Sequence, residues 1–117
     1  MSRESSERGK RGQPYSVLMP VYGKERPDWF LEAAKSMMAQ TAPPDEFVIV
    51  CDGPLTEELE AGIEELKRQA PGLFSILRLN RQEGLGKALA KGVLLCKNSL
   101  IARMDSDDVA LRSESVV

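Results

Sequence analysis

The feature that most constrains this chain is the alternation of short, continuous apolar runs with longer amphipathic segments. Runs rich in apolar and β-branched residues occupy 15–22, 46–53, 74–80 and 99–104. Between them, apolar residues recur every three or four positions over 27–41, 57–70 and 84–97. The first pattern is typical of strands buried on both faces, and the second of helices with one buried face. The order β-α-β-α-β-α-β predicts an α/β, Rossmann-like three-layer sandwich with a mainly parallel sheet.

The helix segments carry start and stop signals and a predicted inner face. Pro27 and Asp28 favour a helix start, Thr56 is a candidate N-cap for the second helix, and Pro71-Gly72 favours its end. The predicted inner residues are Phe30, Ala33, Ala34, Met37, Met38 and Thr41 in the first helix, Leu59, Ile63, Leu66 and Ala70 in the second, and Leu85, Ala88, Leu89, Gly92, Val93 and Cys96 in the third.

Distinctive residues follow three of the predicted strands. Parallel α/β sheets bind ligands at the carboxyl ends of their strands, near the point where the strand order reverses. The sequence places Pro20-Val21-Tyr22-Gly23 after the first strand, Asp52-Gly53 after the second and Asp105-Ser106-Asp107-Asp108 after the fourth. We therefore expect a ligand site at this edge of the sheet.

The acidic segment after the fourth strand is a candidate metal site. Asp105 and Asp107 are two residues apart, so in an extended chain their carboxylates point the same way and converge on one cation. Oxygen ligands favour Mg²⁺ or Mn²⁺, and Mg²⁺ completes its shell with phosphate oxygens and water. Asp108 reaches the metal only if the chain turns there. The alternative is an acidic turn that caps a helix.

The other candidate ligands each have a structural alternative. Asp52 is either a carboxylate that binds a nucleobase or ribose, or part of a common Asp-Gly turn. Tyr22 either stacks on a base or closes its strand. Lys87 lies in the first turn after Gly84-Leu85-Gly86, where N–H groups and the helix dipole attract phosphate. The alternative for Lys87 is a solvated surface position.

Composition excludes several classes of protein. The 117 residues suit one domain, and a net charge of −2 gives no basic face for nucleic acid. The absence of histidine and the spacing of the two cysteines argue against zinc sites and Ser-His-Asp chemistry. No apolar run has the length of a transmembrane helix or a signal peptide. We expect a disordered leader over 1–14, a domain over 15–117, and a cytoplasmic protein, either free or peripheral to the inner face of a membrane.

Four segments together resemble the nucleotide-binding half of family 2 glycosyltransferases, which are inverting enzymes of GT-A fold. They are "SVLMPVY", "FLEAAKSMMAQTAPPDEFVIVCDGP", "LRLNRQEGLGKALAKG" and "ARMDSDD", the last similar to the family's metal-binding DxD motif. The resemblance runs from about Tyr15 to Leu111. The chain departs from the family pattern in two places: Cys51 stands where an acid is usual, and Ala88-Leu89-Ala90 stands where Ala-Arg-Asn is common.

The resemblance implies a role for each candidate residue. Pro20, Val21 and Tyr22 would border the nucleobase, and Asp52 would bind the base or ribose. Asp105 would approach the ribose or the metal, and Asp107 or Asp108 would hold Mn²⁺ or Mg²⁺ on the diphosphate. The implied donor is a nucleotide-diphosphate sugar, with a UDP-sugar expected, and the implied acceptor is a saccharide or a lipid-linked molecule in polysaccharide or glycolipid biosynthesis.

The family's acceptor-binding half, which supplies the catalytic base, has no counterpart in the resemblance. We therefore expect a donor-binding domain that is inactive alone, with the catalytic base unknown. A homo-oligomer that covers the open face stays possible. Two alternatives also stay open: a non-catalytic nucleotide-sugar-binding module, and a phosphatase of the haloacid dehalogenase type, whose DxDx[TV] pattern "MDSDDV" fits.

Overall fold

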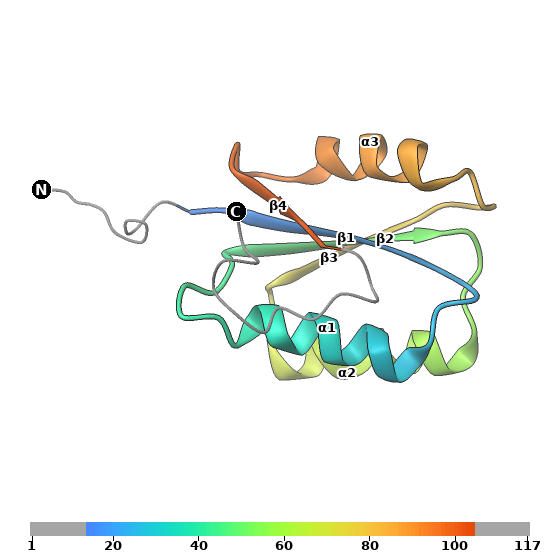
Figure 1. The fold of residues 1–117 in the computed structure, drawn as a ribbon, viewed down its shortest axis with the longest axis horizontal. Coiled ribbons are helices and arrows are strands. Elements are labelled where there is room, and N and C mark those ends of the chain that lie inside the picture. Colours follow the sequence, from blue (N-terminus) through green and yellow to red (C-terminus); the bar gives the residue numbers. More distant parts are fainter. Residues whose placement is uncertain (1–13, 105–117) are drawn as a thin grey trace, which may run out of the picture.

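A computed structural model of the protein describes residues 14–104 as a four-stranded sheet with three helices (Figure 1). The elements alternate along the chain as predicted. They are β1 (Ser16–Tyr22), α1 (Pro27–Met38), β2 (Glu46–Asp52), α2 (Glu57–Gln69), β3 (Phe74–Arg78), α3 (Leu85–Leu95) and β4 (Ile101–Arg103). The third and fourth strands are shorter than the apolar runs that predicted them.

The sheet is parallel throughout, in the order β3-β2-β1-β4. Helices α1 and α2 cover one face and α3 covers the other, which confirms the three-layer α/β architecture (Figure 1). The chain adds β2 and β3 on one side of β1, then crosses to the other side to form β4. The strand order therefore reverses between β1 and β4, and their carboxyl ends mark the expected ligand edge.

The core is divided between the two faces of the sheet. The larger cluster joins β1 and β2 to α1 and α2 through residues such as Phe30, Phe47 and Leu59. The smaller cluster lies under α3 and has Leu18, Val48, Val50 and Ala88 as its buried members. Since alternate strand residues point to opposite faces, this division fixes the side of the sheet on which each edge residue lies.

The predicted inner faces of two helices need correction. Thr41 lies beyond the end of α1 and is exposed. Leu85 and Val93 were predicted to face the sheet from α3, but they are 49% and 46% exposed. The buried residues of α3 are Ala88 and Gly92, because these small side chains let the helix approach the sheet closely.

A polar cluster fixes the far end of α3 to the amino-terminal edge of the sheet. The buried Glu46 carboxylate accepts hydrogen bonds from the Ser16 hydroxyl and from the Lys97 backbone N–H, both at 2.7 Å. The Asn98 amide in turn donates to the Ser16 hydroxyl at 3.1 Å. These bonds hold the segment after α3 against β1 and β2, at the edge opposite the candidate site.

Candidate nucleotide-binding edge

The carboxyl ends of β1 and β2 lie side by side. Tyr22 and Asp52, the last residues of these strands, are register partners. Tyr22 is half-buried, whereas Asp52 is only 6% exposed. The structure thus brings together two of the residues that the sequence predicted for the site.

Asp52 is held by the loop that leads into α3. One carboxylate oxygen accepts from the Glu83 backbone N–H at 2.7 Å, and the other accepts from the Gly84 backbone N–H at 3.1 Å. Gly84 is the N-cap residue of α3, and no side chain of the helix itself caps it. Asp52 therefore fixes the start of α3 from a strand more than thirty residues earlier.

Two glycines let the loops at this edge pack closely. A Cβ on Gly53 would lie 2.8 Å from the Gln82 backbone nitrogen, and the φ of Gly53 is 92°, a conformation that favours glycine. A Cβ on Gly23 would lie 2.7 Å from the Pro54 carbonyl oxygen. The turns after β1 and β2 and the loop after β3 consequently form one contiguous surface around Asp52.

The other candidate site residues within residues 14–104 differ in how far they are buried. Pro20 is buried, and the side chain of Val21, 1% exposed, belongs to the core beneath α1 and α2. A ligand at this position would therefore meet main chain rather than the Val21 side chain. Lys87 is exposed in the first turn of α3, at the same end of the helix as the loop that Asp52 holds.

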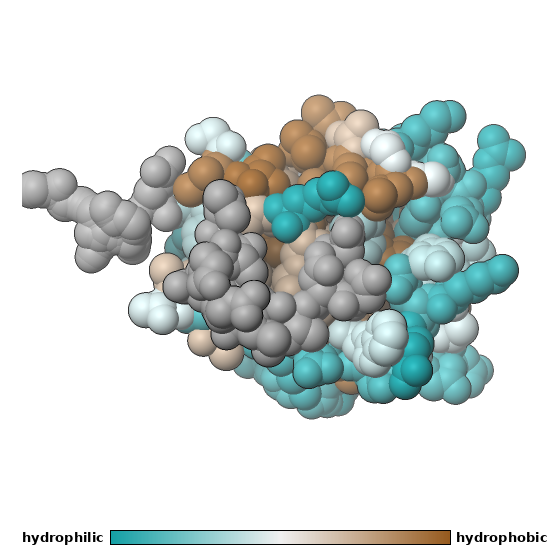
Figure 2. Space-filling view, viewed as in Figure 1, coloured by the Kyte–Doolittle hydropathy of each residue, from teal (hydrophilic) through white to brown (hydrophobic). Residues whose placement is uncertain are grey.

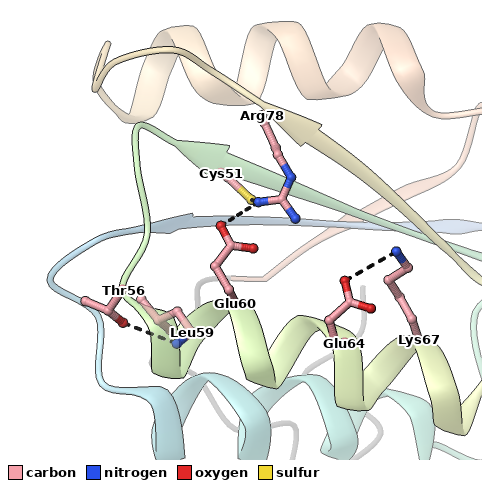
Figure 3. A network of polar contacts seen from close by, with 7 residues as sticks. All are labelled: Cys51, Thr56, Leu59, Glu60, Glu64, Lys67 and Arg78. Atoms are coloured by element: carbon pink, nitrogen blue, oxygen red, sulfur yellow. Dashed lines mark hydrogen bonds and ion pairs between the residues drawn. The ribbon is translucent and has the colours of Figure 1, made fainter.

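Cys51 lies on the opposite side of the sheet from the Asp52 carboxylate. Its side chain belongs to the cluster under α2, and the Arg78 guanidinium lies 4.0 Å from its sulfur (Figure 3). The same guanidinium nitrogen donates to the Glu60 carboxylate of α2 at 2.6 Å (Figure 3). Burial raises the pKa of the Cys51 thiol to about 11, so the thiol is neutral and unreactive near neutral pH.

This placement limits what the replacement of the family's usual acid by Cys51 can change at the candidate site. An acid there would point toward Arg78, which in this chain takes its carboxylate partner from Glu60. The carboxylate on the α3 side of the sheet, Asp52, is unaffected. The pairing of Arg78 with a residue from α2 was not evident from the sequence, because the two residues are distant in the chain and only the packing of α2 brings them together.

The candidate metal ligands Asp105, Asp107 and Asp108 lie outside the described residues, and so does the predicted leader up to Gln13. The described chain reaches Met104, whose backbone N–H donates to the Leu18 carbonyl of β1. Within residues 14–104, no group of three His, Cys, Asp or Glu side chains is arranged to hold a metal ion.

Taken together, the edge offers a half-buried aromatic ring, a fixed carboxylate and a helix start with a nearby lysine. The sequence profile described as Glycosyl transferase family 2 matches residues 16–114. The chain belongs to glycosyl transferase family 2.

Relatives of this family 2 chain include two named bacterial glycosyltransferases. It is 39% identical over 97 residues to the amylovoran biosynthesis glycosyltransferase AmsE of Erwinia amylovora. It is 38% identical over 95 residues to an Escherichia coli UDP-Gal:alpha-D-GlcNAc-diphosphoundecaprenol beta-1,3-galactosyltransferase. These alignments cover 83% and 81% of this chain but only 36% and 34% of the relatives, so the chain spans about a third of their length.

The family 2 chain also shares its fold with solved glycosyltransferase structures. One is a mannosyltransferase from Pyrobaculum calidifontis in complex with GDP-Man and Mn²⁺, with a TM-score of 0.75 at 18% identity. The match covers 88% of this chain and 30% of that one. The likeness confirms the expected GT-A architecture.

Proposed function

We propose that this chain is the donor-binding part of a glycosyltransferase and that it binds a nucleotide-diphosphate sugar at the carboxyl edge of its sheet. The observation that carries the proposal is the fixed arrangement of Tyr22, Asp52 and the start of α3 beside the reversal point of the strand order. Membership of family 2 and the polysaccharide-building relatives support it. A UDP-sugar is the proposed donor, as in the name of the Escherichia coli relative.

The described residues suggest how the nucleoside would be held. Tyr22 is exposed enough to pack against a base, beside the buried Pro20 and the main chain at Val21. Asp52 keeps the loop after β3 in place, and in this proposal it would bind the base or ribose. Lys87 and the N–H groups at the start of α3 face the same edge, where positive potential favours a diphosphate.

A divalent metal, Mn²⁺ or Mg²⁺, completes the proposal. The aspartates Asp105, Asp107 and Asp108 would hold it, and oxygen ligands of this kind suit either ion. When bound, the metal would neutralise charge that builds on the departing nucleoside diphosphate. Two fold neighbours support this choice, because their structures contain Mn²⁺ together with GDP-Man or with UDP and GalNAc.

The acceptor is proposed to be a saccharide or a lipid-linked sugar, following the diphosphoundecaprenol in the name of one relative. Transfer by inversion needs a base within hydrogen-bond reach of the attacking hydroxyl. Asp52 is poorly suited to that role, since both its oxygens already accept backbone hydrogen bonds. Asp52 is therefore not assigned as the base, and the catalytic base stays unassigned.

Calorimetry of UDP binding, with and without Mn²⁺, tests the proposal. We expect UDP to bind more tightly with the metal, and Asp107→Asn to remove most of that difference because an amide carries no charge. Asp28→Asn is the matched control, since Asp28 is an exposed carboxylate that pairs with Arg26 on α1. Equal UDP affinity with and without metal would contradict the metal assignment, and no UDP binding at all would contradict the donor site.

A non-catalytic nucleotide-sugar-binding module is the second candidate, supported by the poor suitability of Asp52 as a base. Incubation with nucleotide sugars, Mn²⁺ and saccharide or lipid-linked acceptors separates the two. Glycosylated product above background would contradict the non-catalytic reading. Membership of family 2 leaves the phosphatase alternative without support.

A further inference from the structure

The outer surface of α3 and the segment after it combines exposed aliphatic side chains with exposed cations. Leu94 is 84% exposed, and Val93, Leu95 and Leu100 are between 39% and 46% exposed. Figure 2 shows these hydrophobic residues gathered over α3 and the segment that leads into β4. Exposed aliphatic residues grouped in this way mark an interaction surface rather than scattered surface positions.

The charged side chains within the segment that forms this surface are all basic. Residues 84–104 contain Lys87, Lys91, Lys97 and Arg103 and no aspartate or glutamate, although residues 14–83 carry an excess of acids. All four cations are exposed. The Lys91 ammonium group forms an ion pair with the Glu83 carboxylate, near the start of α3, at 2.7 Å. The apolar end of the helix lies between Lys97 and the aliphatic stem of Lys91.

We propose that this face of α3 binds the surface of an anionic lipid bilayer, with the aliphatic side chains in the interface and the lysines at the headgroups. An occupant must be both apolar and negatively charged, and an anionic bilayer surface is both. Lysine stems extend along apolar material while their ammonium groups stay at the charged layer.

A second copy of the chain fits this face less well. A two-fold pairing would set the same surface against itself and bring lysine against lysine. The face also lies on the opposite side of the sheet from α1 and α2, so binding there leaves those helices in water (Figure 1). None of the described helices is long and apolar enough to cross a bilayer.

Sedimentation with vesicles tests the proposal, using phosphatidylcholine alone and phosphatidylcholine mixed with phosphatidylglycerol. We expect binding only to the anionic vesicles and weakening by salt. Lys91→Gln/Lys97→Gln should lower the partition coefficient roughly 25-fold, about fivefold for each lysine. Leu94→Gln should lower it about tenfold through lost apolar burial. The matched control is Lys35→Gln/Lys67→Gln, which removes the same charge from α1 and α2 and should leave binding nearly unchanged.

Tryptophan fluorescence gives the orientation independently. The single tryptophan, Trp29, is 47% exposed on α1, on the other side of the sheet. Its emission should stay unchanged when vesicles bind, while a tryptophan introduced by Leu94→Trp in a Trp29→Phe background should shift to the blue. Binding that moves Trp29 emission, or that falls equally in the control variant, would overturn the proposal.

Two further outcomes also overturn it: absence of vesicle binding, and a dimer in light scattering that Leu94→Gln dissociates. The second would assign the face to another copy of the chain. None of these readouts uses a nucleotide, so their failure is separable from failure of the proposed donor site.

Discussion

Replacement of Asp52 by asparagine should destabilise the domain by removing one of the two hydrogen bonds that join β2 to the start of α3. The carboxylate, 6% exposed, accepts two backbone N–H groups, at 2.7 Å from Glu83 and 3.1 Å from Gly84. An asparagine keeps one acceptor oxygen but turns an NH₂ group toward the other N–H donor. A hydrogen bond to a charged group contributes about 1.5–3 kcal/mol, so we expect Asp52→Asn to cost about 2–3 kcal/mol.

Urea denaturation measures this loss, and amide hydrogen exchange locates it. Protection should fall at Glu83 and Gly84 in Asp52→Asn, because their N–H groups lose the acceptor that orders the loop. Asp28→Asn is the control. Its carboxylate pairs with Arg26 in an ion pair whose side chains are 65% and 61% exposed, so we expect no measurable change in the free energy of unfolding. A loss below about 0.5 kcal/mol in Asp52→Asn, with exchange unchanged, would refute the anchoring role.

Two other perturbations test the packing of the sheet. Gly92→Ala puts a methyl group 2.5 Å from Leu18 Cδ1 and 2.6 Å from Val50 Cγ2. The free energy of unfolding should therefore fall by about 1–3 kcal/mol. An unchanged Tm would contradict the close packing of α3 on the sheet. Burial raises the pKa of the Cys51 thiol from 9.0 to about 11, so the unfolded chain loses this proton first as pH rises. The free energy of unfolding should therefore fall between about pH 9 and 11, and Cys51→Ala should flatten that fall in urea denaturation at stepped pH.

The order of the elements and the class of fold were predictable from the sequence alone. Hydrophobic period and residue type are local properties, and they distinguish the strands from the helices in the correct order. The Thr56 cap was also predictable and is confirmed by the bond from the Leu59 N–H at 3.2 Å. Parallel topology follows once strands and helices alternate, because each helix returns the chain to the same edge of the sheet.

The expected juxtaposition at the sheet edge is partly confirmed. Tyr22 and Asp52 are neighbours because both end parallel strands. The order of those strands, with β4 beside β1 rather than beside β3, is a result of the tertiary structure. The roles of Asp105, Asp107 and Asp108 stay predictions, because these residues lie outside the described part of the chain.

The contacts of Asp52 and the outward face of α3 were decided by packing. Sequence spacing gives the period of α3 but not its rotation, since apolar residues occur around most of the helix. The sheet selects the side with Ala88 and Gly92, because only small side chains allow the close approach to Leu18 and Val50, and Leu94 is left in solvent. Asp52 likewise meets a loop distant in sequence. Local patterns determine which elements form, while close packing between distant segments determines which residues those elements present.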